Sequence, residues 1–334
     1  MRNISYLNAI KEAMREEMER DSDVFLIGED IGRHGGAFGV TRGLFDRFGQ
    51  DRVIDTPISE GTIISCAIGA AIAGMRPVAE IMFIDFATLA MDQIANQAAK
   101  IRHMLGGQVT IPIVVRLPEG SGYKGTAAQH SQCLEAWFAH IPGLKVVMPS
   151  NPYNAKGLFK SAVRDNNPVI FIEQKSLYSM KGPVPEYDYT VPIGQSQITR
   201  EGSDITIATY SYMTKVSLEL AEKLSEENIN VEVIDILSLK PLDIMTVIKS
   251  VKKTGRLVVA HEACKTFGVG AEISALVCEQ AFEYLKAPIE RVAALDVPIP
   301  FNYAEERAVI VNETELEQAI RKVLAYRKVS ILSM

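Results

Sequence analysis

The sequence predicts an α/β protein with two domains, the first built on a mostly parallel sheet covered by helices on both faces. Short apolar runs alternate with segments of helical periodicity along the 334 residues, as a sheet with crossover helices requires. A segment rich in proline, glycine and tyrosine interrupts this alternation at residues 181–202, as an inter-domain linker would. The alternation then restarts, which indicates a second, smaller α/β domain, and the length also favours two domains.

In the first half, Leu7, Ile10, Met14 and Met18 recur at helical spacing and predict an amphipathic helix. Further helices are expected near residues 41–48 and over 62–74, 87–104 and 153–164. Strands are expected over 24–27, 52–54, 77–82, 111–116, 145–148 and 169–172. Two glycine-rich loops, 32–39 and 120–125, connect these elements, and composition indicates that the second loop is mobile. Such loops are often plain connections, but at strand ends they can line a ligand crevice.

The second half repeats the pattern after the linker. Strands are expected over residues 204–209, 231–236, 257–260 and 290–293, and helices over 215–225, 242–251, 270–282 and 313–324. We therefore expect a first domain at residues 1–180, a linker at 181–202 and a second domain at 203–334.

Composition narrows the classes of function. Apolar residues make up 47% and charged residues 23% of the chain, as in ordinary soluble proteins. The formal charge of 35 − 41 = −6, with both signs interspersed, argues against nucleic acid or an anionic membrane as the main partner. The sequence has neither an apolar signal segment nor a membrane-length apolar run. Four scattered cysteines, Cys66, Cys133, Cys264 and Cys278, are expected to be reduced thiols in a cytoplasmic protein.

The absence of several glycine, serine and histidine motifs argues against the kinds of site that they form. The sequence contains no G-x-x-x-x-G-K-[ST] phosphate loop, no G-x-S-x-G nucleophile elbow, and no H-x-x-x-H or Cys/His cluster for a transition metal. Gly268-Val269-Gly270 lacks the third glycine of a dinucleotide-binding turn and does not directly close a strand. Close packing of a helix is therefore the preferred interpretation of these glycines.

One acid, Glu60, is the first candidate for function. It follows a strand-like segment and a proline-containing turn, and it opens into an apolar helix; the next basic residue is Arg76, after fourteen positions beyond Gly61. A carboxylate in such a setting is either desolvated at a cost or paired with a group from elsewhere. The alternative is a helix cap, in which Ser59 or Glu60 accepts hydrogen bonds from free amides at the start of the helix.

His130, after the second glycine loop, is the other candidate, although most histidines in proteins are surface or core residues. Composition and spacing alone go no further than a two-domain α/β protein with one candidate acid and one candidate histidine.

Several separated motifs carry a family resemblance. They are Gly28-Glu29-Asp30, Asp55-Thr56-Pro57-Ile58-Ser59-Glu60, Asp92-Gln93-Ile94, Ala127-Ala128-Gln129-His130-Ser131-Gln132, Pro142-Gly143-Leu144-Lys145-Val146-Val147, Asp165-Asn166-Asn167-Pro168, Ser238-Leu239-Lys240-Pro241-Leu242-Asp243 and Gly268-Val269-Gly270-Ala271-Glu272. Their order over residues 4–324 resembles the beta subunit of the thiamine-diphosphate-dependent decarboxylating component of 2-oxo acid dehydrogenase complexes. This group includes the pyruvate, branched-chain and acetoin dehydrogenases. The resemblance implies a transketolase-like pyrimidine-binding domain followed by a domain like the C-terminal domain of transketolase.

The resemblance also implies roles for particular residues. Glu60 matches the glutamate that hydrogen-bonds the cofactor's aminopyrimidine ring and drives its tautomerisation. Glu29 and Ile58 would join this cofactor-binding site, and Phe86 matches an aromatic residue that stacks on the pyrimidine. His130 matches the histidine that handles protons as the acyl group passes to a lipoyl arm.

Members of the family also bind a monovalent cation, usually potassium, mostly through carbonyl oxygens. The matching positions here are Ile113, Ala162, Val163, Asp165 and Asn167. A plain cap of the turn before Asn167-Pro168 is an equally good interpretation of Asp165.

The Gly-Asp-Gly signature that holds the diphosphate and its Mg²⁺ lies on the alpha subunit in this family, and it does not occur in this sequence. The resemblance therefore implies an α2β2 heterotetramer, inactive without its alpha subunit, that delivers acyl groups to the lipoyl domain of a dihydrolipoyl acyltransferase core. Pyruvate, a branched 2-oxo acid and acetoin remain open as the small-molecule substrate. Two alternative functions are a stand-alone transketolase-like enzyme and a non-catalytic scaffold that docks the acyltransferase core.

Overall fold

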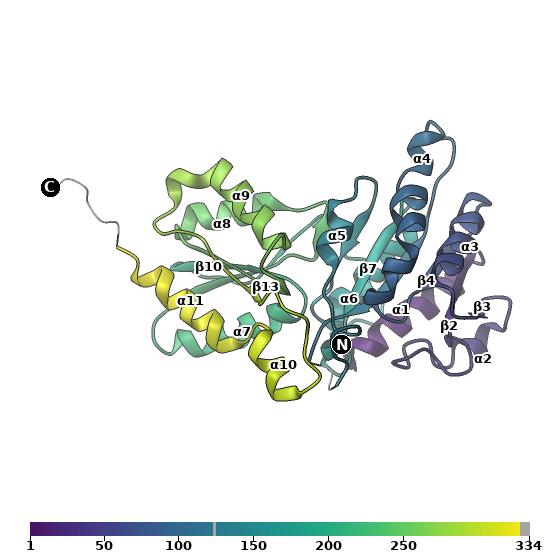
Figure 1. Ribbon diagram of the computed structural model, residues 1–334, viewed down its shortest axis with the longest axis horizontal. Helices are drawn as coiled ribbons and strands as arrows, with labels where there is room; N and C mark the ends of the chain where they lie inside the picture. The colour runs from purple at the N-terminus through teal and green to yellow at the C-terminus, as the bar shows by residue number, and fades with distance from the viewer. Residues whose placement is uncertain (123–124, 328–334) are drawn as a thin grey trace.

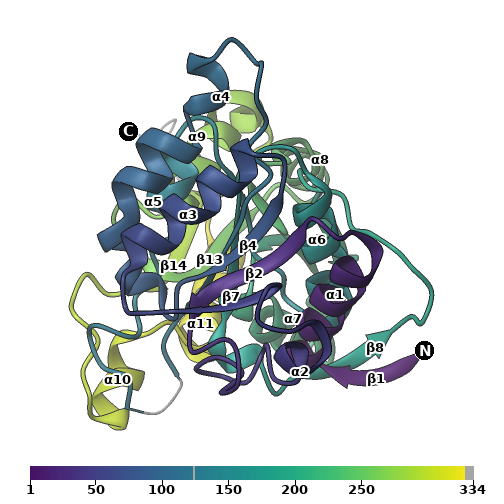
Figure 2. The ribbon, with the colours of Figure 1, turned by 90° about the vertical axis from the view of Figure 1, so that its right-hand side faces the viewer.

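A seven-stranded sheet organises the first domain of the computed structural model, which describes residues 1–122 and 125–327 (Figures 1 and 2). Its strand order is β12-β6-β7-β5-β4-β2-β3, and all neighbours are parallel except β12, which runs antiparallel to β6. The strands are β2 (Val24–Glu29), β3 (Val53–Thr56), β4 (Arg76–Glu80), β5 (Val114–Glu119), β6 (Lys145–Val147), β7 (Val169–Gln174) and β12 (Ser238–Lys240).

Helices cover both faces of this sheet. Figure 2 shows α1 (Tyr6–Arg20) and α6 (Pro152–Arg164) on one side of the strands, and α3 (Glu60–Ile72) and α5 (Glu135–His140) on the other. Because helices cover both faces and successive strand residues point to opposite faces, most strand residues are buried. They include charged residues such as Arg116 of β5 and Glu173 of β7, which form an ion pair at 2.6 Å. The remaining short elements are α2 (Leu44–Phe48), η1 (Ile84–Ala90), η2 (Gln93–Ala98), α4 (Ile101–Met104) and η3 (Lys175–Leu177).

A five-stranded sheet, ordered β14-β13-β10-β11-β9, forms the second domain, and only β9 runs antiparallel to its neighbour. The strands are β9 (Gln197–Arg200), β10 (Ile205–Thr209), β11 (Val231–Asp235), β13 (Leu257–Cys264) and β14 (Glu290–Ala294). The helices are α7 (Tyr212–Ser225), α8 (Ile244–Thr254), α9 (Val269–Ala281), η4 (Phe282–Tyr284), α10 (Tyr303–Val309) and α11 (Glu313–Ala325). One continuous apolar core joins residues of both domains, including Val146 of β6 and Val259 of β13.

The predicted fold class is confirmed, but the helix expected over residues 87–104 is wrong as a single α-helix. The segment is instead a 3₁₀ helix (η1), a π-helical stretch (η2) and the short helix α4. Ile84, Ala87, Ala90, Ile94 and Ala98 are all buried. Their spacings of three and four also fit an ordinary α-helix, so the spacing alone does not explain the break.

The segment expected to be a linker, residues 181–202, contains a short strand at each end. At its start, β8 (Lys181–Val184) pairs with β1 (Arg2–Ser5); at its end, β9 joins the second sheet. The division into residues 1–180, 181–202 and 203–334 remains a proposal. The predicted mobile loop 120–125 includes residues 123 and 124, which lie outside the described residues.

All four cysteines are free thiols, as expected. Within residues 1–122 and 125–327, no helix is both long enough and apolar enough to cross a membrane.

Candidate active site

Four of the predicted site residues follow four neighbouring strands. Glu29 ends β2, Glu60 follows β3, Phe86 follows β4, and His130 lies in the segment after β5. These strands are adjacent in the order β5-β4-β2-β3 and parallel, so their carboxyl ends meet at one edge of the sheet. Ligands of open α/β sheets bind in the crevice at this edge.

Glu60 is the first residue of α3, and it is only 9% exposed. Ser59 does not cap the helix, because its hydroxyl bonds the hydroxyl of Thr62 at 2.7 Å instead of a free amide. Within the described chain, the Glu60 carboxylate has no recorded hydrogen bond or ion pair. The helix-cap alternative is therefore not supported. The N-terminus of α3 still favours a negative charge at this position.

Two further acids surround Glu60. Glu29 is half-buried, and burial, followed by the negative charges of Asp30 and Glu60, raises the pKa of its carboxyl group. Asp30 has a left-handed backbone with a φ of 55°. No salt bridge to Glu29, Asp30 or Glu60 occurs among the described residues. This edge therefore carries uncompensated negative charge, which a ligand with a protonated nitrogen would relieve.

A backbone contact fixes the two loops that flank Glu60. The amide of Gly32 donates to the carboxylate of Asp55 at 2.6 Å. A Cβ atom at Gly32 would lie 2.3 Å from an Asp55 carboxylate oxygen, so a side chain at this position would displace the carboxylate from the hydrogen bond. The loop after β2 is thereby held against the end of β3. Ile58, between Asp55 and Glu60, is 75% exposed and offers an apolar contact beside the acid.

The His130 ring lies between two phenylalanine rings. Its centroid is 4.7 Å from the Phe83 ring and 5.2 Å from the Phe86 ring, both in edge-to-face arrangement. The Lys175 ammonium donates to the His130 carbonyl and lies 5.0 Å from the centre of the Phe83 ring. Burial lowers the pKa of Lys175 against the opposing effect of nearby acids such as Asp85. The half-buried imidazole is thus held by its contacts with the two phenylalanine rings and by the hydrogen bond from Lys175 to the backbone of His130.

Sequence reasoning missed Phe83 and Lys175. Both follow strands at the same edge: Phe83 comes three residues after β4, and Lys175 comes directly after β7. The strand-end rule would have selected them. Gln132 and Asp85, which bond at 2.9 Å, link the segment of His130 to the beginning of η1 and were also missed. Their contact joins residues 47 positions apart.

The positions that resemble a potassium site lie at the opposite edge of the sheet. Ile113 directly precedes β5, Asn167 lies just before β7, and Ala162 and Val163 are in the last turn of α6. They are therefore separate from the Glu60 edge. Any role of a cation here would be structural and not chemical.

The contacts of Asp165 support the turn-cap interpretation. Its carboxylate accepts from the backbone and the side-chain amide of Asn167, both at 2.9 Å, and pairs with the Lys145 ammonium. Although burial opposes the change, these hydrogen bonds lower the pKa of Asp165. The Arg76 guanidinium already donates to the carbonyls of Val163, at 2.9 Å, and Asp165, at 2.7 Å. Because Arg76 already donates to the Val163 and Asp165 carbonyls, these two carbonyls could bind a monovalent cation only through their remaining lone pairs.

The glycines at 268 and 270 serve close packing, as predicted. A Cβ atom at Gly268 would lie 2.6 Å from the imidazole of His261, and one at Gly270 would lie 2.8 Å from it. The start of α9 therefore packs directly on the His261 ring. This ring stacks on Tyr210 at a centroid distance of 5.9 Å. The contact leaves no room for a dinucleotide.

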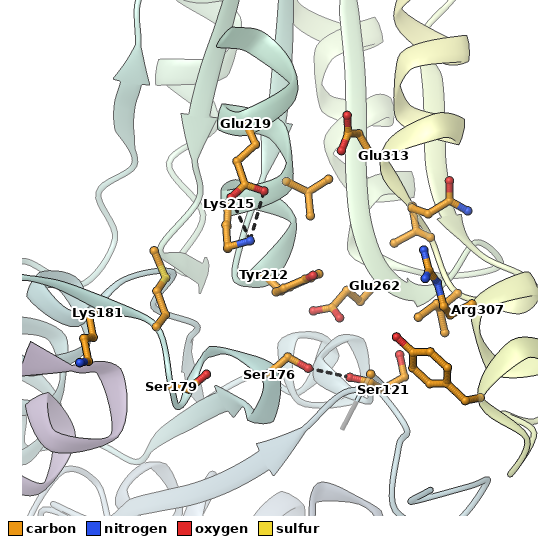
Figure 3. Close-up of a pocket in the computed structure, with 17 residues that line it drawn as sticks. Ser121, Ser176, Ser179, Lys181, Tyr212, Lys215, Glu219, Glu262, Arg307 and Glu313 are labelled. Carbon is orange, nitrogen blue, oxygen red and sulfur yellow. Dashed lines mark hydrogen bonds and ion pairs between the residues drawn. The ribbon is translucent and has the colours of Figure 1, made fainter. Parts of the chain in front are cut away.

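A cavity of about 740 Å³ lies between the two domains (Figure 3). Glu262 and Arg307 line it, together with Ser121 and Gly122 at the start of the loop after β5. Burial, opposed by a hydrogen bond from Gln174, raises the pKa of Glu262 to about 8. Neither Glu60 nor His130 lines this cavity. It borders the loop that leads to His130 and is distinct from the strand edge that carries Glu60.

Comparison with known proteins agrees with this architecture. The family "Transketolase, pyrimidine binding domain" matches residues 2–181, and "Transketolase, C-terminal domain" matches residues 194–315. A solved structure described as "Split gene transketolase, inactive beta4 tetramer" superposes with a TM-score of 0.79 at 23% identity, covering 96% of this chain and 98% of that chain. The two sheets and these matches define a two-domain protein of the transketolase class.

Three related proteins narrow the class of protein further. The acetoin:2,6-dichlorophenolindophenol oxidoreductase subunit beta of Cupriavidus necator is 47% identical, covering 97% of this chain and 98% of its own length. The pyruvate dehydrogenase E1 component subunit beta of Rickettsia felis is 47% identical, covering 97% and 99%. The 2-oxoisovalerate dehydrogenase subunit beta of Bacillus subtilis is 46% identical, covering 97% and 99%. The chain belongs to the family of E1 beta subunits of the pyruvate, 2-oxoisovalerate and acetoin dehydrogenases.

Proposed function

We propose that this chain is the beta subunit of a thiamine-diphosphate-dependent dehydrogenase. The enzyme oxidises a small 2-oxo acid or acetoin and passes the acyl group to the lipoyl arm of a dihydrolipoyl acyltransferase. The observation that supports this most is the Glu60 carboxylate. It is buried at the carboxyl edge of the sheet, lies close to Glu29, and has no hydrogen-bond or ion-pair partner among the described residues.

The residues at this edge fit the pyrimidine end of the cofactor. When bound, thiamine diphosphate supplies a carbanion at its thiazolium ring that attacks the substrate carbonyl. Glu60 would hold a proton between its carboxylate and the pyrimidine ring nitrogen. Burial strengthens such a hydrogen bond. Ile58 and Phe86 would supply apolar contacts on either side of the acid.

His130 is proposed to move a proton when the acyl group passes to the lipoyl sulfur. An imidazole suits this task because its unperturbed pKa lies close to neutrality. The Phe83 and Phe86 rings orient the imidazole from two sides. The Lys175 ammonium fixes the backbone of the same residue.

The chain is proposed to supply half of an active site. Because the sequence contains no Gly-Asp-Gly signature, the diphosphate and its Mg²⁺ would be held by an alpha subunit in an α2β2 heterotetramer. The exposed Ile58 side chain, beside Glu60, is consistent with an active site completed by another chain. The free thiols support a reducing, cytoplasmic location. A potassium ion at Ile113, Ala162, Val163, Asp165 and Asn167 is part of this proposal.

Reconstitution with the alpha subunit tests the proposed function. The pair should reduce an artificial dye with pyruvate, a branched 2-oxo acid or acetoin, in a reaction that requires thiamine diphosphate, whereas the purified chain alone should not. The preferred substrate separates the three kinds of dehydrogenase. Turnover by the chain alone would instead favour a stand-alone transketolase-like enzyme. A pair that assembles and binds the acyltransferase but turns over none of the three substrates would favour a scaffold.

A further inference from the structure

A buried carboxylate of the second domain holds the backbone of the loop after β5. The amide of Gly122 donates to Oε1 of Glu306, on α10, at 2.7 Å. The two residues are 184 positions apart in the chain. Glu306 is 1% exposed, and its other oxygen, Oε2, is buried without a hydrogen-bond partner among the described residues.

Burial of Glu306 with one unpaired oxygen lowers the stability of the folded chain. A buried carboxylate with an unpaired oxygen loses its hydration without full compensation. A hydrogen bond from a backbone amide to a carboxylate is among the stronger ones. Glu306 therefore fixes Gly122 firmly, at the expense of the stability of α10.

The residue before Gly122 is held by the first domain. The Ser121 carbonyl accepts from the Ser176 hydroxyl at 3.1 Å (Figure 3) and from the Gln174 amide at 3.4 Å. The same Gln174 amide donates to Glu262 of the second domain at 2.8 Å. Ser121 is thus bonded to the first domain and Gly122 to the second, and Gln174 makes a further contact across the boundary.

The loop continues to the candidate catalytic histidine. A Cβ atom at Gly125 would lie 3.4 Å from the Phe301 ring, so the chain passes closely over the segment that leads into α10. The Thr126 hydroxyl then bonds the Ser131 hydroxyl at 2.6 Å, which closes the turn around His130. The described residues on either side of positions 123 and 124, Gly122 and Gly125, thus both lie against α10 or the segment that leads into it.

We propose that Glu306 is a positioning residue for His130, acting through its hydrogen bond to the Gly122 amide. The second domain would then contribute to acyl transfer, in addition to its packing against the first domain. This inference rests on the proposed function, in which His130 moves a proton during transfer to the lipoyl arm. Glu306 itself touches no reacting group.

Three substitutions at Glu306 distinguish the effect of side-chain length from the effect of charge. Glu306→Gln keeps an oxygen at the same distance and removes the charge. Glu306→Asp keeps the charge and withdraws the oxygen by one methylene, and Glu306→Ala removes both. Glu305→Ala is the matched control, because Glu305 is the preceding residue of the same helix, is exposed, and has no recorded side-chain hydrogen bond within the described chain.

The first readout is hydrogen exchange of the full chain, followed in peptides covering residues 118–132. Loss of one backbone hydrogen bond of about 1.4 kcal/mol speeds local exchange about tenfold. We expect this acceleration in Glu306→Ala and Glu306→Asp, and wild-type exchange in Glu306→Gln and Glu305→Ala. Equal exchange in Glu306→Ala and the control overturns the inference. Faster exchange in Glu306→Gln together with wild-type exchange in Glu306→Asp would also overturn the inference.

The second readout compares two activities of the reconstituted heterotetramer. Misplacing His130 should lower transfer to a lipoyl domain about 10- to 100-fold and leave dye reduction, which does not need that transfer, within about twofold. A purely structural defect would lower both in proportion, and such a result overturns the positioning role. If the wild-type pair turns over none of the substrates, the proposed function fails. The exchange comparison then supports or overturns the Glu306 contact by itself.

Discussion

Glu29 and Glu60 lie at the ends of adjacent parallel strands, close enough that the charge of Glu60 contributes, after burial and the charge of Asp30, to the raised pKa of Glu29. No ion pair to either carboxylate occurs within the described chain. In the proposed function, a protonated heterocycle held against Glu60 would relieve the repulsion between the two carboxylates.

Replacement of His130 should separate the two half-reactions. In His130→Asn, transfer to a lipoyl domain should fall by about two to four orders of magnitude, because a general acid–base group is lost, whereas dye reduction should change much less. Stopped-flow reduction of a lipoyl domain and a dye assay on the same heterotetramer measure the two rates. His103→Asn, an exposed histidine on α4, is the control. Equal losses in both assays would count against the proposed role of His130.

The second domain should lose stability in mild acid because of His261. This fully buried imidazole has a pKa that burial lowers to about 4, against about 6.5 in the unfolded chain. Its contribution is therefore complete above about pH 6.5 and is lost as the pH falls toward 4, by about 3 kcal/mol in total. Urea unfolding at several pH values should show a weaker decline for His261→Leu than for wild type. Parallel declines would contradict this explanation.

Gly268 should tolerate no side chain while His261 is present. Gly268→Ala places a Cβ atom within 2.6 Å of the ring and should lower the free energy of unfolding by about 1–3 kcal/mol, as overpacking does. Denaturant titration measures the change. Gly69→Ala is the control, since nothing lies within 4 Å of its Cβ position. The same Cβ position lies 2.7 Å from the Cys264 carbonyl oxygen, so combining Gly268→Ala with His261→Ala should recover only the part of the loss that comes from the ring. A double mutant with no recovery would exclude the ring as a cause.

A potassium site at the amino edge of the sheet predicts an ion-specific effect on stability. At constant ionic strength, thermal unfolding of the heterotetramer should occur a few degrees higher in potassium chloride than in choline chloride, as expected for a ligand that binds only the folded state. The carbonyls of Val163 and Asp165 already accept from Arg76, so the effect should be modest. Identical unfolding temperatures in the two salts would remove the cation from the proposal.

The strands could be predicted from sequence because most residues of a parallel strand buried on both faces are apolar, which produces short apolar runs. Residues 84–98 show where that reasoning fails. Their buried apolar residues are spaced by three and four, as in an ordinary α-helix. The sequence pattern therefore does not distinguish an α-helix from the 3₁₀ and π-helical turns that the segment forms. The packing of Gly268 on His261 was predicted as close packing, although its partner could not be named.

The site was predictable only in part. Glu60 could be selected because the surrounding sequence lacks cations, and His130 because the family resemblance marks it. Phe83 and Lys175 could have been selected as residues that follow strands, but their contacts with His130 depend on strand order, which single-sequence patterns do not give. The Glu306–Gly122 hydrogen bond joins residues 184 positions apart, and no local signal reports such a contact.

The most direct test of the account is the dye-coupled turnover of a Glu60→Gln heterotetramer at saturating thiamine diphosphate. The variant removes the carboxylate and keeps the size of the side chain, so the α2β2 assembly, checked by gel filtration, should persist. Turnover should fall by at least two orders of magnitude. Turnover within a few-fold of wild type, in a properly assembled heterotetramer, would contradict the assignment of Glu60 as the group that activates the cofactor.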